Sequence, residues 1–187
     1  MNNNSFYSYS ELKKLGFNSL GINVFISKFS NIYNPNLISI GNNVRIDDFC
    51  ILSGNIEIGS YIHVSAYTAI YAKFGVRIED YSTISGRNLI YSQNDDYSGQ
   101  FLANPLVPEE YRNVSGGRVV IKKFSIIGAG CIILPNITIG EGCAIGSISL
   151  VNKDLEDWKI YAGIPVKYLK ERSKNIIELA KKLKNNL

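Results

Sequence analysis

Aliphatic side chains recur at every sixth position in two long stretches of this chain of 187 residues. The main series consists entirely of Ile, Leu and Val: Ile40, Ile46, Leu52, Ile58, Val64, Ile70, and then Ile121, Ile127, Ile133, Ile139, Ile145, Val151. A second series lies two residues earlier and is aliphatic or small throughout: Ile38, Val44, Cys50, Ile56, Ile62, Thr68, and then Val119, Ser125, Cys131, Ile137, Cys143, Ser149. Because residues two apart share one face of a strand, the pattern predicts short strands with inward pairs, joined by tight corners.

The corners carry turn-forming residues, such as Gly41-Asn42-Asn43 and Pro135-Asn136. Parallel coils of this kind stack about 4.8 Å apart into a three-sided prism, and at about eighteen residues a coil the chain would make about six coils. An amphipathic helix would need spacings of three and four residues. A sandwich of antiparallel strands would not keep an unbroken six-residue step. We therefore predict an all-β fold, a parallel β-helix.

Residues 92–118 break the pattern and are rich in Asp, Asn, Pro and Gly. A loop of this length inside a compact domain is usually functional. We expect one β-helix domain over residues 1–172, from which this loop protrudes, followed by a C-terminal segment over 173–187.

The sequence predicts a helix near each end of the chain. Ser8 and Glu11 have the spacing of a capping box, so residues 8–16 should form a short helix that stops at Gly16. Residues 173–185 carry apolar side chains at helical spacing and predict a terminal helix.

Composition excludes several classes of protein. A net charge of +4, with no basic stripe, argues against nucleic-acid binding. A single histidine cannot supply the three ligands of a zinc carbonic anhydrase, so we expect no metal. The three cysteines are odd in number, the N-terminus lacks the pattern of a signal peptide, and no apolar run approaches about 18 residues; we therefore expect a cytoplasmic protein without a membrane span.

The repeats Ser125-Ile-Ile-Gly128, Ile137-Thr-Ile-Gly140 and Cys143-Ala-Ile-Gly146 are followed by the tail Tyr161-Ala-Gly-Ile-Pro165. Together they resemble the hexapeptide-repeat acyltransferases, and the resemblance covers roughly residues 20 to 172. It implies a left-handed β-helix, acetyl-CoA as co-substrate, and a homotrimer with the cofactor between neighbouring prisms.

Four further segments resemble bacterial acetyltransferases of surface-polysaccharide clusters: Ile46-Asp-Asp-Phe-Cys-Ile-Leu-Ser-Gly54, Asp95-Asp-Tyr-Ser-Gly99, Asn104-Pro-Leu-Val-Pro108 and Tyr111-Arg-Asn-Val114. Some of these enzymes acetylate galactoside hydroxyls, and others the amine of a dTDP-4-amino-4,6-dideoxy sugar. We predict N-acetylation of such a nucleotide sugar for cell-surface glycan synthesis. Two alternatives are O-acetylation of a saccharide and a non-catalytic β-helix scaffold, which would not need the basic C-terminal tail.

His63 is the candidate catalytic base, because it is the one side chain whose ordinary pKa suits proton transfer near neutral pH. Its neighbours Ile62 and Val64 form an inward pair, so His63 points out of a prism face. In well-known sugar acetyltransferases of the family the histidine lies in a later repeat, where this chain has Gly128-Ala-Gly-Cys131. The alternatives are a solvated surface histidine and a substrate-assisted reaction.

The loop offers candidate substrate-binding residues. A carboxylate of Asp95 or Asp96 can hold the ammonium group of an amino sugar, and Arg112 can bind a phosphate through two hydrogen bonds. Tyr97 and Tyr111 complete the predicted substrate site.

The family resemblance also implies the residues that bind CoA. Lys167, Lys170 and Arg172 would meet its phosphates, and Lys153 would lie beside the adenine. Backbone groups of Ala129 and Ser147 would line the pantetheine arm.

Side chains outside these sites have structural interpretations. The three cysteines lie in the inward series, which makes them core residues rather than nucleophiles. We expect Trp158 to pack in an end cap. The outward aromatic residues Phe49, Tyr61, Tyr67 and Phe124 need cover, which a trimer interface would provide.

Overall fold

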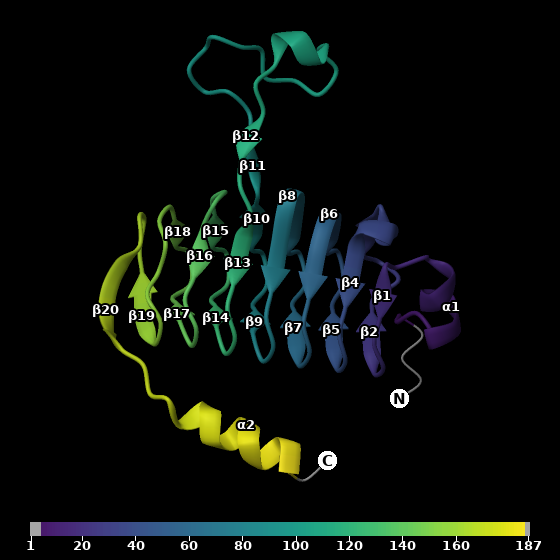
Figure 1. Ribbon diagram of the computed structural model, residues 1–187, viewed down its shortest axis with the longest axis vertical. Helices are drawn as coiled ribbons and strands as arrows, with labels where there is room; N and C mark the ends of the chain where they lie inside the picture. The colour runs from purple at the N-terminus through teal and green to yellow at the C-terminus, as the bar shows by residue number, and fades with distance from the viewer. Residues whose placement is uncertain (1–4, 186–187) are drawn as a thin grey trace.

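The structure, a computed structural model, describes residues 5–185 and is a three-sided parallel β-helix of the left-handed type (Figure 1). Its first face stacks parallel strands in this order: β2 (Val24–Ile26), β5 (Val44–Ile46), β7 (Ile62–Val64), β9 (Thr83–Ile84), β14 (Ile126–Ile127), β17 (Ala144–Ile145), β19 (Lys159–Ala162). This face therefore has seven rungs, close to the predicted six coils.

The other two faces share two long strands. The second face contains β3 (Asn31–Tyr33), the first half of β6 (Ile51–Ile58), the first half of β8 (Ala69–Ile78), β10 (Leu89–Tyr91), β15 (Ile132–Ile133) and β18 (Leu150–Val151). The third face contains β1 (Ser19–Leu20), β4 (Ile38–Ile40), the second halves of β6 and β8, β13 (Val119–Ile121) and β16 (Thr138–Ile139). A 3-10 turn, η1 (Pro35–Leu37), precedes β4.

All residues of both six-residue series are buried, so the predicted interior of the prism is confirmed. The cysteines pack inside it as predicted: burial raises the pKa of the Cys50 thiol to about 11 and that of Cys143 to about 12. Thiols with raised pKa values are poor nucleophiles.

β8 absorbs a two-residue slip in the pattern as it turns from the second face to the third. Each of the two long strands turns at a glycine with positive φ, Gly54 in β6 at 96° and Gly75 in β8 at 97°, and a Cβ on Gly54 would lie 2.6 Å from the carbonyl oxygen of Ala72. Glycine occupies both positions because it adopts positive φ without the steric cost that a side chain would bring.

Aromatic side chains cover one another along the prism edges. Tyr61 stacks on Tyr81 with ring centroids 4.8 Å apart, and Tyr81 stacks on Phe124 at 5.2 Å. On another edge Phe49 stacks on Tyr67 at 5.0 Å. Because these rings find partners within the chain, their outward position is not by itself an argument for an oligomer.

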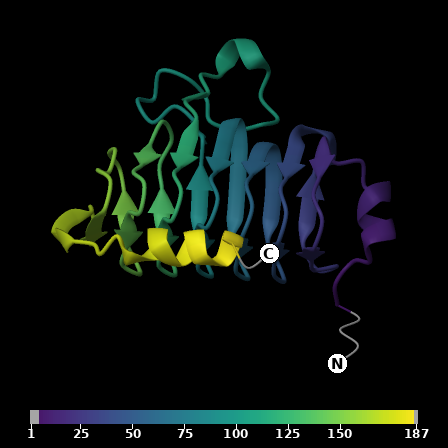
Figure 2. The same cartoon turned by 60° about the horizontal axis from the view of Figure 1, so that its bottom comes forward.

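The two predicted helices and the loop flank the prism. Ser8 caps α1 (Tyr9–Lys14) in a complete capping box with Glu11, as predicted. The loop rises from a stem in which β11 (Gln93–Asn94) pairs with β12 (Ser115–Gly116), and it carries η2 (Glu109–Tyr111). After β19 the chain turns back in β20 (Lys167–Glu171) and then forms α2 (Asn175–Asn185), which lies along the prism (Figure 2).

Candidate active site

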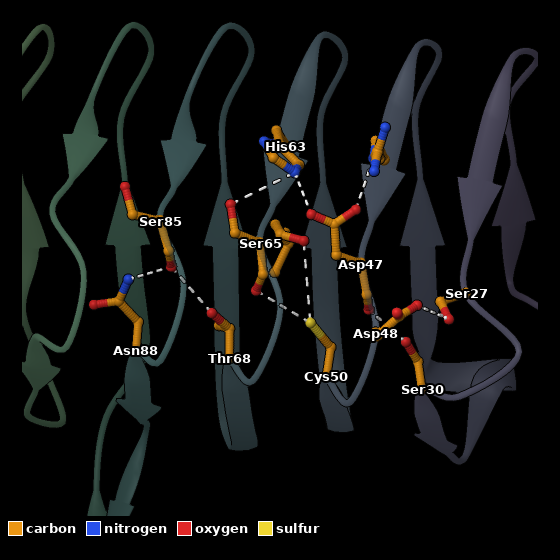
Figure 3. Close-up of polar contacts among 12 residues, drawn as sticks. Ser27, Ser30, Asp47, Asp48, Cys50, His63, Ser65, Thr68, Ser85 and Asn88 are labelled. Carbon is orange, nitrogen blue, oxygen red and sulfur yellow. Dashed lines mark hydrogen bonds and ion pairs between the residues drawn. The ribbon is translucent and has the colours of Figure 1, made fainter. Parts of the chain in front are cut away.

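His63 lies at the centre of β7, and its half-exposed side chain points outward from the first face. Its Nε2 lies 2.7 Å from Oδ2 of Asp47, one coil away (Figure 3). The other carboxylate oxygen of Asp47 accepts a hydrogen bond from Nε of Arg45 at 2.6 Å. Because a carboxylate only accepts hydrogen bonds, the neutral ring donates from Nε2 and keeps its lone pair on Nδ1.

Asp47 stays ionised in this arrangement. Partial burial opposes its charge, but hydrogen bonds from Arg45 and His63 outweigh that effect and lower the pKa of the carboxyl below its ordinary value. The ionised carboxylate fixes the ring orientation of His63 through the hydrogen bond to Nε2.

The corner at which the first face turns into the second is called the first edge, and it is defined by Ser65, Ser85, Ala129 and Ser147. Ser65 Oγ lies 3.5 Å from His63 Nε2, and Ser85 follows on the next coil (Figure 3). The ladder continues from β9 to β14 and β17, after which Ala129 and Ser147 follow. The predicted base and the predicted pantetheine positions therefore lie along one edge, a few coils of about 4.8 Å apart.

Ala129 and Ser147 contact each other on adjacent coils. The Ala129 amide donates to Ser147 Oγ at 3.2 Å, and the Ala129 carbonyl accepts from Ile148 at 2.8 Å. The chain thus already uses both backbone groups of Ala129. A carbonyl oxygen has a second lone pair, which leaves it able to accept from a pantetheine amide.

The predicted phosphate-binding lysines are exposed on β20. This strand runs antiparallel to β19, with Lys167 opposite Ala162 and Lys170 opposite Ile160. Lys153 is also exposed, beyond β18. All three lysines lie on the last coils at the C-terminal end of the prism, several coils away from His63.

We expect Lys167 and Lys170 to bind the phosphates of CoA, so the double variant Lys167→Glu, Lys170→Glu should raise the KM for acetyl-CoA at least tenfold, because a carboxylate repels a phosphate where an ammonium group would bind it. Steady-state kinetics with varied acetyl-CoA measure this. The matched control is Lys181→Glu, Lys182→Glu on α2, which makes the same charge change on another element. An unchanged KM in the first variant would remove these two lysines from the cofactor site.

Arg172 differs from the two lysines because its guanidinium already forms hydrogen bonds within the chain. Its Nη1 donates to the carbonyl oxygens of Phe124, Gly142 and Cys143 at 2.8, 2.9 and 3.3 Å. Burial lowers the pKa of the guanidinium. The geometry thus gives Arg172 a structural task that the sequence did not predict: it ties the end of β20 to the preceding coils.

Arg172→Ala should lower the free energy of unfolding by about 2 kcal/mol, because it leaves three carbonyl groups without their charged donor. For a chain of this size that is a fall in Tm of about 4 to 8 °C. Calorimetry or thermal circular dichroism checks it. Lys170→Ala removes an exposed cation from β20, two residues before Arg172, and should leave Tm nearly unchanged; equal Tm values for both variants would contradict the structural role.

The base of the loop forms a cavity of about 630 Å³ that brings together three predicted substrate residues, Asp95, Tyr97 and Arg112. The stacked rings of Tyr71 and Tyr91, 5.2 Å between centroids, form part of its wall. The Arg112 side chain is 18% exposed, and its buried Nε has no hydrogen-bond partner among the described residues. An unpaired buried donor of this kind fits an anionic or polar ligand.

The other two predicted loop residues lie outside this cavity. Asp96 accepts hydrogen bonds from Ser98 Oγ and from the amide of Gly99 at 2.9 and 3.0 Å. Despite desolvation, these bonds lower the pKa of Asp96. Tyr111 is exposed and lines a smaller hollow beside Phe101. Asp96 therefore stabilises a local turn of the loop, whereas Asp95 lines the cavity at the base of the loop.

Sequence reasoning did not single out the polar residues around His63. Asp47, Ser65 and Ser85 each stand directly after the inward residue that ends a strand of the first face, and Ser27 has the same position on the first coil. The equivalent positions on the later coils are Gly128 and Gly146. The residue at this corner position changes from polar on the coils near His63 to glycine on the later coils. This change was the signal in the sequence that distinguishes the part of the edge beside the histidine from the part expected to bind CoA.

Neither helix between residues 5 and 185 combines the length and the apolar composition that a membrane span requires. In the same part of the chain, no three His, Cys, Asp or Glu side chains gather closely enough to hold a metal ion.

No family model matches the chain. It is 49% identical over 172 residues to a dTDP-4-amino-4,6-dideoxy-D-glucose acyltransferase of Escherichia coli, and the match covers 90% of each protein. The solved structure of AntD, an N-acyltransferase from Bacillus cereus in complex with dTDP and 3-hydroxybutyryl-CoA, is 53% identical, covers 98% of both chains and superposes with a TM-score of 0.95.

Fold, edge and relatives together define an acyltransferase of the hexapeptide-repeat class. More narrowly, the chain belongs to the family of dTDP-4-amino-4,6-dideoxy-sugar acyltransferases. Variants of AntD at one serine and at one aspartate, ten positions apart in the middle of its chain, have also been solved, and two of the serine variants contain dTDP-4-amino-4,6-dideoxyglucose and CoA.

Proposed function

We propose that the chain transfers an acetyl or another short acyl group from CoA to the amino group of a dTDP-4-amino-4,6-dideoxy-hexose, in the cytoplasm, for cell-surface glycan synthesis. The observation that carries the proposal is the first edge, where an oriented imidazole lies in line with the expected path of CoA. The match of nearly the whole chain to AntD, which binds dTDP and an acyl-CoA, supports the same assignment.

His63 acts as the base in this proposal. The neutral sugar amine attacks the thioester carbonyl, and the new C–N bond forms as the carbonyl becomes an oxyanion. Nδ1 of His63 takes the proton that the nitrogen loses. The oxyanion then collapses, the C–S bond breaks, and the imidazolium can return its proton to the departing thiolate of CoA.

Ser85 and Asp95 are the next candidates at the reacting centre. They lie ten positions apart in the middle of this chain, the spacing of the serine and the aspartate altered in AntD. Ser85 lies on the first edge, one coil from Ser65 (Figure 3). Asp95 can accept a hydrogen bond from the sugar amino group and so orient the nitrogen toward the thioester carbonyl.

One chain cannot bring these groups together by itself, and this supports a shared site. Ser85 precedes β10 and Asp95 follows it, so the whole second face separates the first edge from the loop. In a homotrimer the loop of one copy can reach the first edge of its neighbour, with CoA between them. We therefore propose a trimer whose three sites each combine His63 of one copy with Asp95 of the next.

The test is direct transfer of the acetyl group from acetyl-CoA to dTDP-4-amino-4,6-dideoxyglucose, followed as thiol release and as product mass. A galactoside that has hydroxyls and no amine is the comparison substrate, because O-acetylation would use the same base and edge. Turnover of the galactoside alone would replace the proposed function with O-acetylation. Failure of the protein to bind CoA would favour the non-catalytic scaffold.

A further inference from the structure

The last helix of the chain, α2, has little of its surface covered by the rest of the molecule. None of its eleven residues is buried, and it lies along the prism on the side away from the loop (Figures 1 and 2). The reaction and the CoA binding proposed above do not use it. Because a helix of this length is marginally stable on its own in water, α2 needs a surface against which to pack.

The prism supplies that surface only in part. The apolar side of α2 faces Tyr81, Phe124 and Ile126 across an open hollow of about 320 Å³. Leu179 and Leu183 line this hollow and yet remain 54% and 41% exposed. The apolar side of the helix therefore rests on the prism without being sealed by it.

The helix and the two residues before it are strongly basic. Residues 173–185 contain four Lys and one Glu, so they hold +3 of the net charge of +4. All four lysines are exposed: Lys174, Lys181, Lys182 and Lys184. Lys181 pairs with Glu178 at 2.8 Å, whereas the other three form no ion pair within residues 5–185.

Apolar and basic sides of this kind are typical of helices that lie on membrane surfaces. Such helices combine a low overall hydrophobicity with an apolar side of Leu or Phe and a polar side rich in Lys. The apolar side chains enter the boundary between head groups and acyl chains, while the lysines stay among the head groups. Each lysine near an anionic surface strengthens binding about fivefold.

Charge favours an anionic lipid surface over the other covers that α2 could find. A second copy of the chain offers no surplus of negative charge, because outside residues 173–185 the net charge is +1. A nucleic acid would attract the lysines, but Leu179 and Leu183 have no rings on which its bases could stack. A membrane with anionic lipids matches both sides of the helix.

The connection to the prism allows α2 to leave the hollow. Arg172 fixes the end of β20 to the preceding coils through three carbonyl groups, so the chain is anchored just before the helix. Release of α2 exposes little additional surface, because none of its residues is buried. Segments with few buried contacts are the ones that open most easily.

We propose that α2 leaves the hollow and holds the enzyme reversibly on a membrane surface that contains anionic lipids. Ile176, Leu179 and Leu183 enter the lipid boundary, and the four lysines lie among the head groups. The loop and the cavity at its base lie on the other side of the prism and stay open to substrates (Figure 1).

Co-sedimentation of the full-length protein with lipid vesicles tests this. We expect vesicles of mixed phosphatidylcholine and phosphatidylglycerol to bind it at least tenfold more tightly than vesicles of phosphatidylcholine alone, with weaker binding at high salt. Lys181→Glu, Lys182→Glu should weaken binding to the mixed vesicles at least tenfold, because it replaces attraction with repulsion. Leu179→Gln, Leu183→Gln should also weaken it at least tenfold, because two apolar side chains no longer enter the lipid.

Two matched controls separate the helix from the rest of the surface. Lys13→Glu, Lys14→Glu makes the same charge change in the last turn of α1, so it should bind the mixed vesicles like wild type. Leu106→Gln removes a leucine of the loop that is 92% exposed, and it should also bind like wild type. The Tm of each variant shows that it is folded.

Several results would overturn the proposal: no binding to mixed vesicles, equal binding to both kinds of vesicle, or equal losses in the α1 and α2 lysine variants. If Leu179→Gln, Leu183→Gln instead changed the sedimentation coefficient of the free protein and left vesicle binding intact, α2 would cover a second copy and the proposal would be wrong. Vesicle binding is measured without substrates, so a protein that binds vesicles but does not acylate the amino sugar would overturn the proposed function alone.

Discussion

His63→Ala should lower kcat for acyl transfer to the amino sugar by about 10²- to 10⁴-fold, the usual contribution of a positioned general base. The KM for acetyl-CoA should change little, because the imidazole lies at the end of the edge away from Ala129 and the basic tail. Kinetics with both substrates varied would separate the two constants.

The control for this variant is Thr83→Ala. Thr83 pairs with His63 on the adjacent coil of the same face, so the change removes a neighbouring polar side chain without removing the base. Thr83→Ala should keep the wild-type kcat. Full activity in His63→Ala would show that the imidazole is not the general base, and it would favour a reaction in which groups of the substrate take the proton.

Mixed trimers of His63→Ala and Asp95→Ala subunits should regain activity that neither variant has alone. If every site takes His63 from one copy and Asp95 from the next, each trimer with a 2:1 composition keeps one intact site, about one third of the total. Co-expression with two different affinity tags, purification over both, and an assay of the mixed species measure this recovery.

Each result of this experiment has a separate meaning. If one chain supplied both residues, no site in a mixed trimer would be intact, and activity would stay at the level of the single variants. If Asp95→Ala alone turned over like wild type, with an unchanged KM for the amino sugar, Asp95 would lose its place at the reacting centre. Sedimentation of the wild-type protein checks the trimer itself.

The interior of the prism could be predicted almost residue by residue. A step of six with inward pairs places two side chains of every short strand inside the prism, and every residue of the two series is buried. The capping box at Ser8 and Glu11 was predictable for a similar reason, since both partners lie within one helical turn.

The contacts around His63 could not be predicted in the same way. Asp47 lies sixteen residues before His63 in sequence, and its carboxylate reaches the ring only because successive coils are in register. Arg172 reaches back to Phe124 across 48 residues for the same reason. Periodicity says which side chains point outward, but the distances between outward atoms depend on how the coils stack.

In the loop, the sequence could not distinguish two neighbouring residues that the structure places differently. Asp95 and Asp96 are adjacent and chemically alike, so the sequence treated them as a pair. The folded loop separates them, with Asp95 in the cavity beside Arg112 and Asp96 in a local turn with Ser98.

By itself, then, the order of residues determined the prism, its buried series, and the outward position of the one imidazole, because these depend on local strand geometry repeated at a fixed interval. Only the tertiary structure decided which polar groups meet that imidazole, which carboxylate of the loop enters a cavity, and that Arg172 serves the fold. Those contacts join residues far apart in the chain, and the distances between their atoms are set when the coils stack.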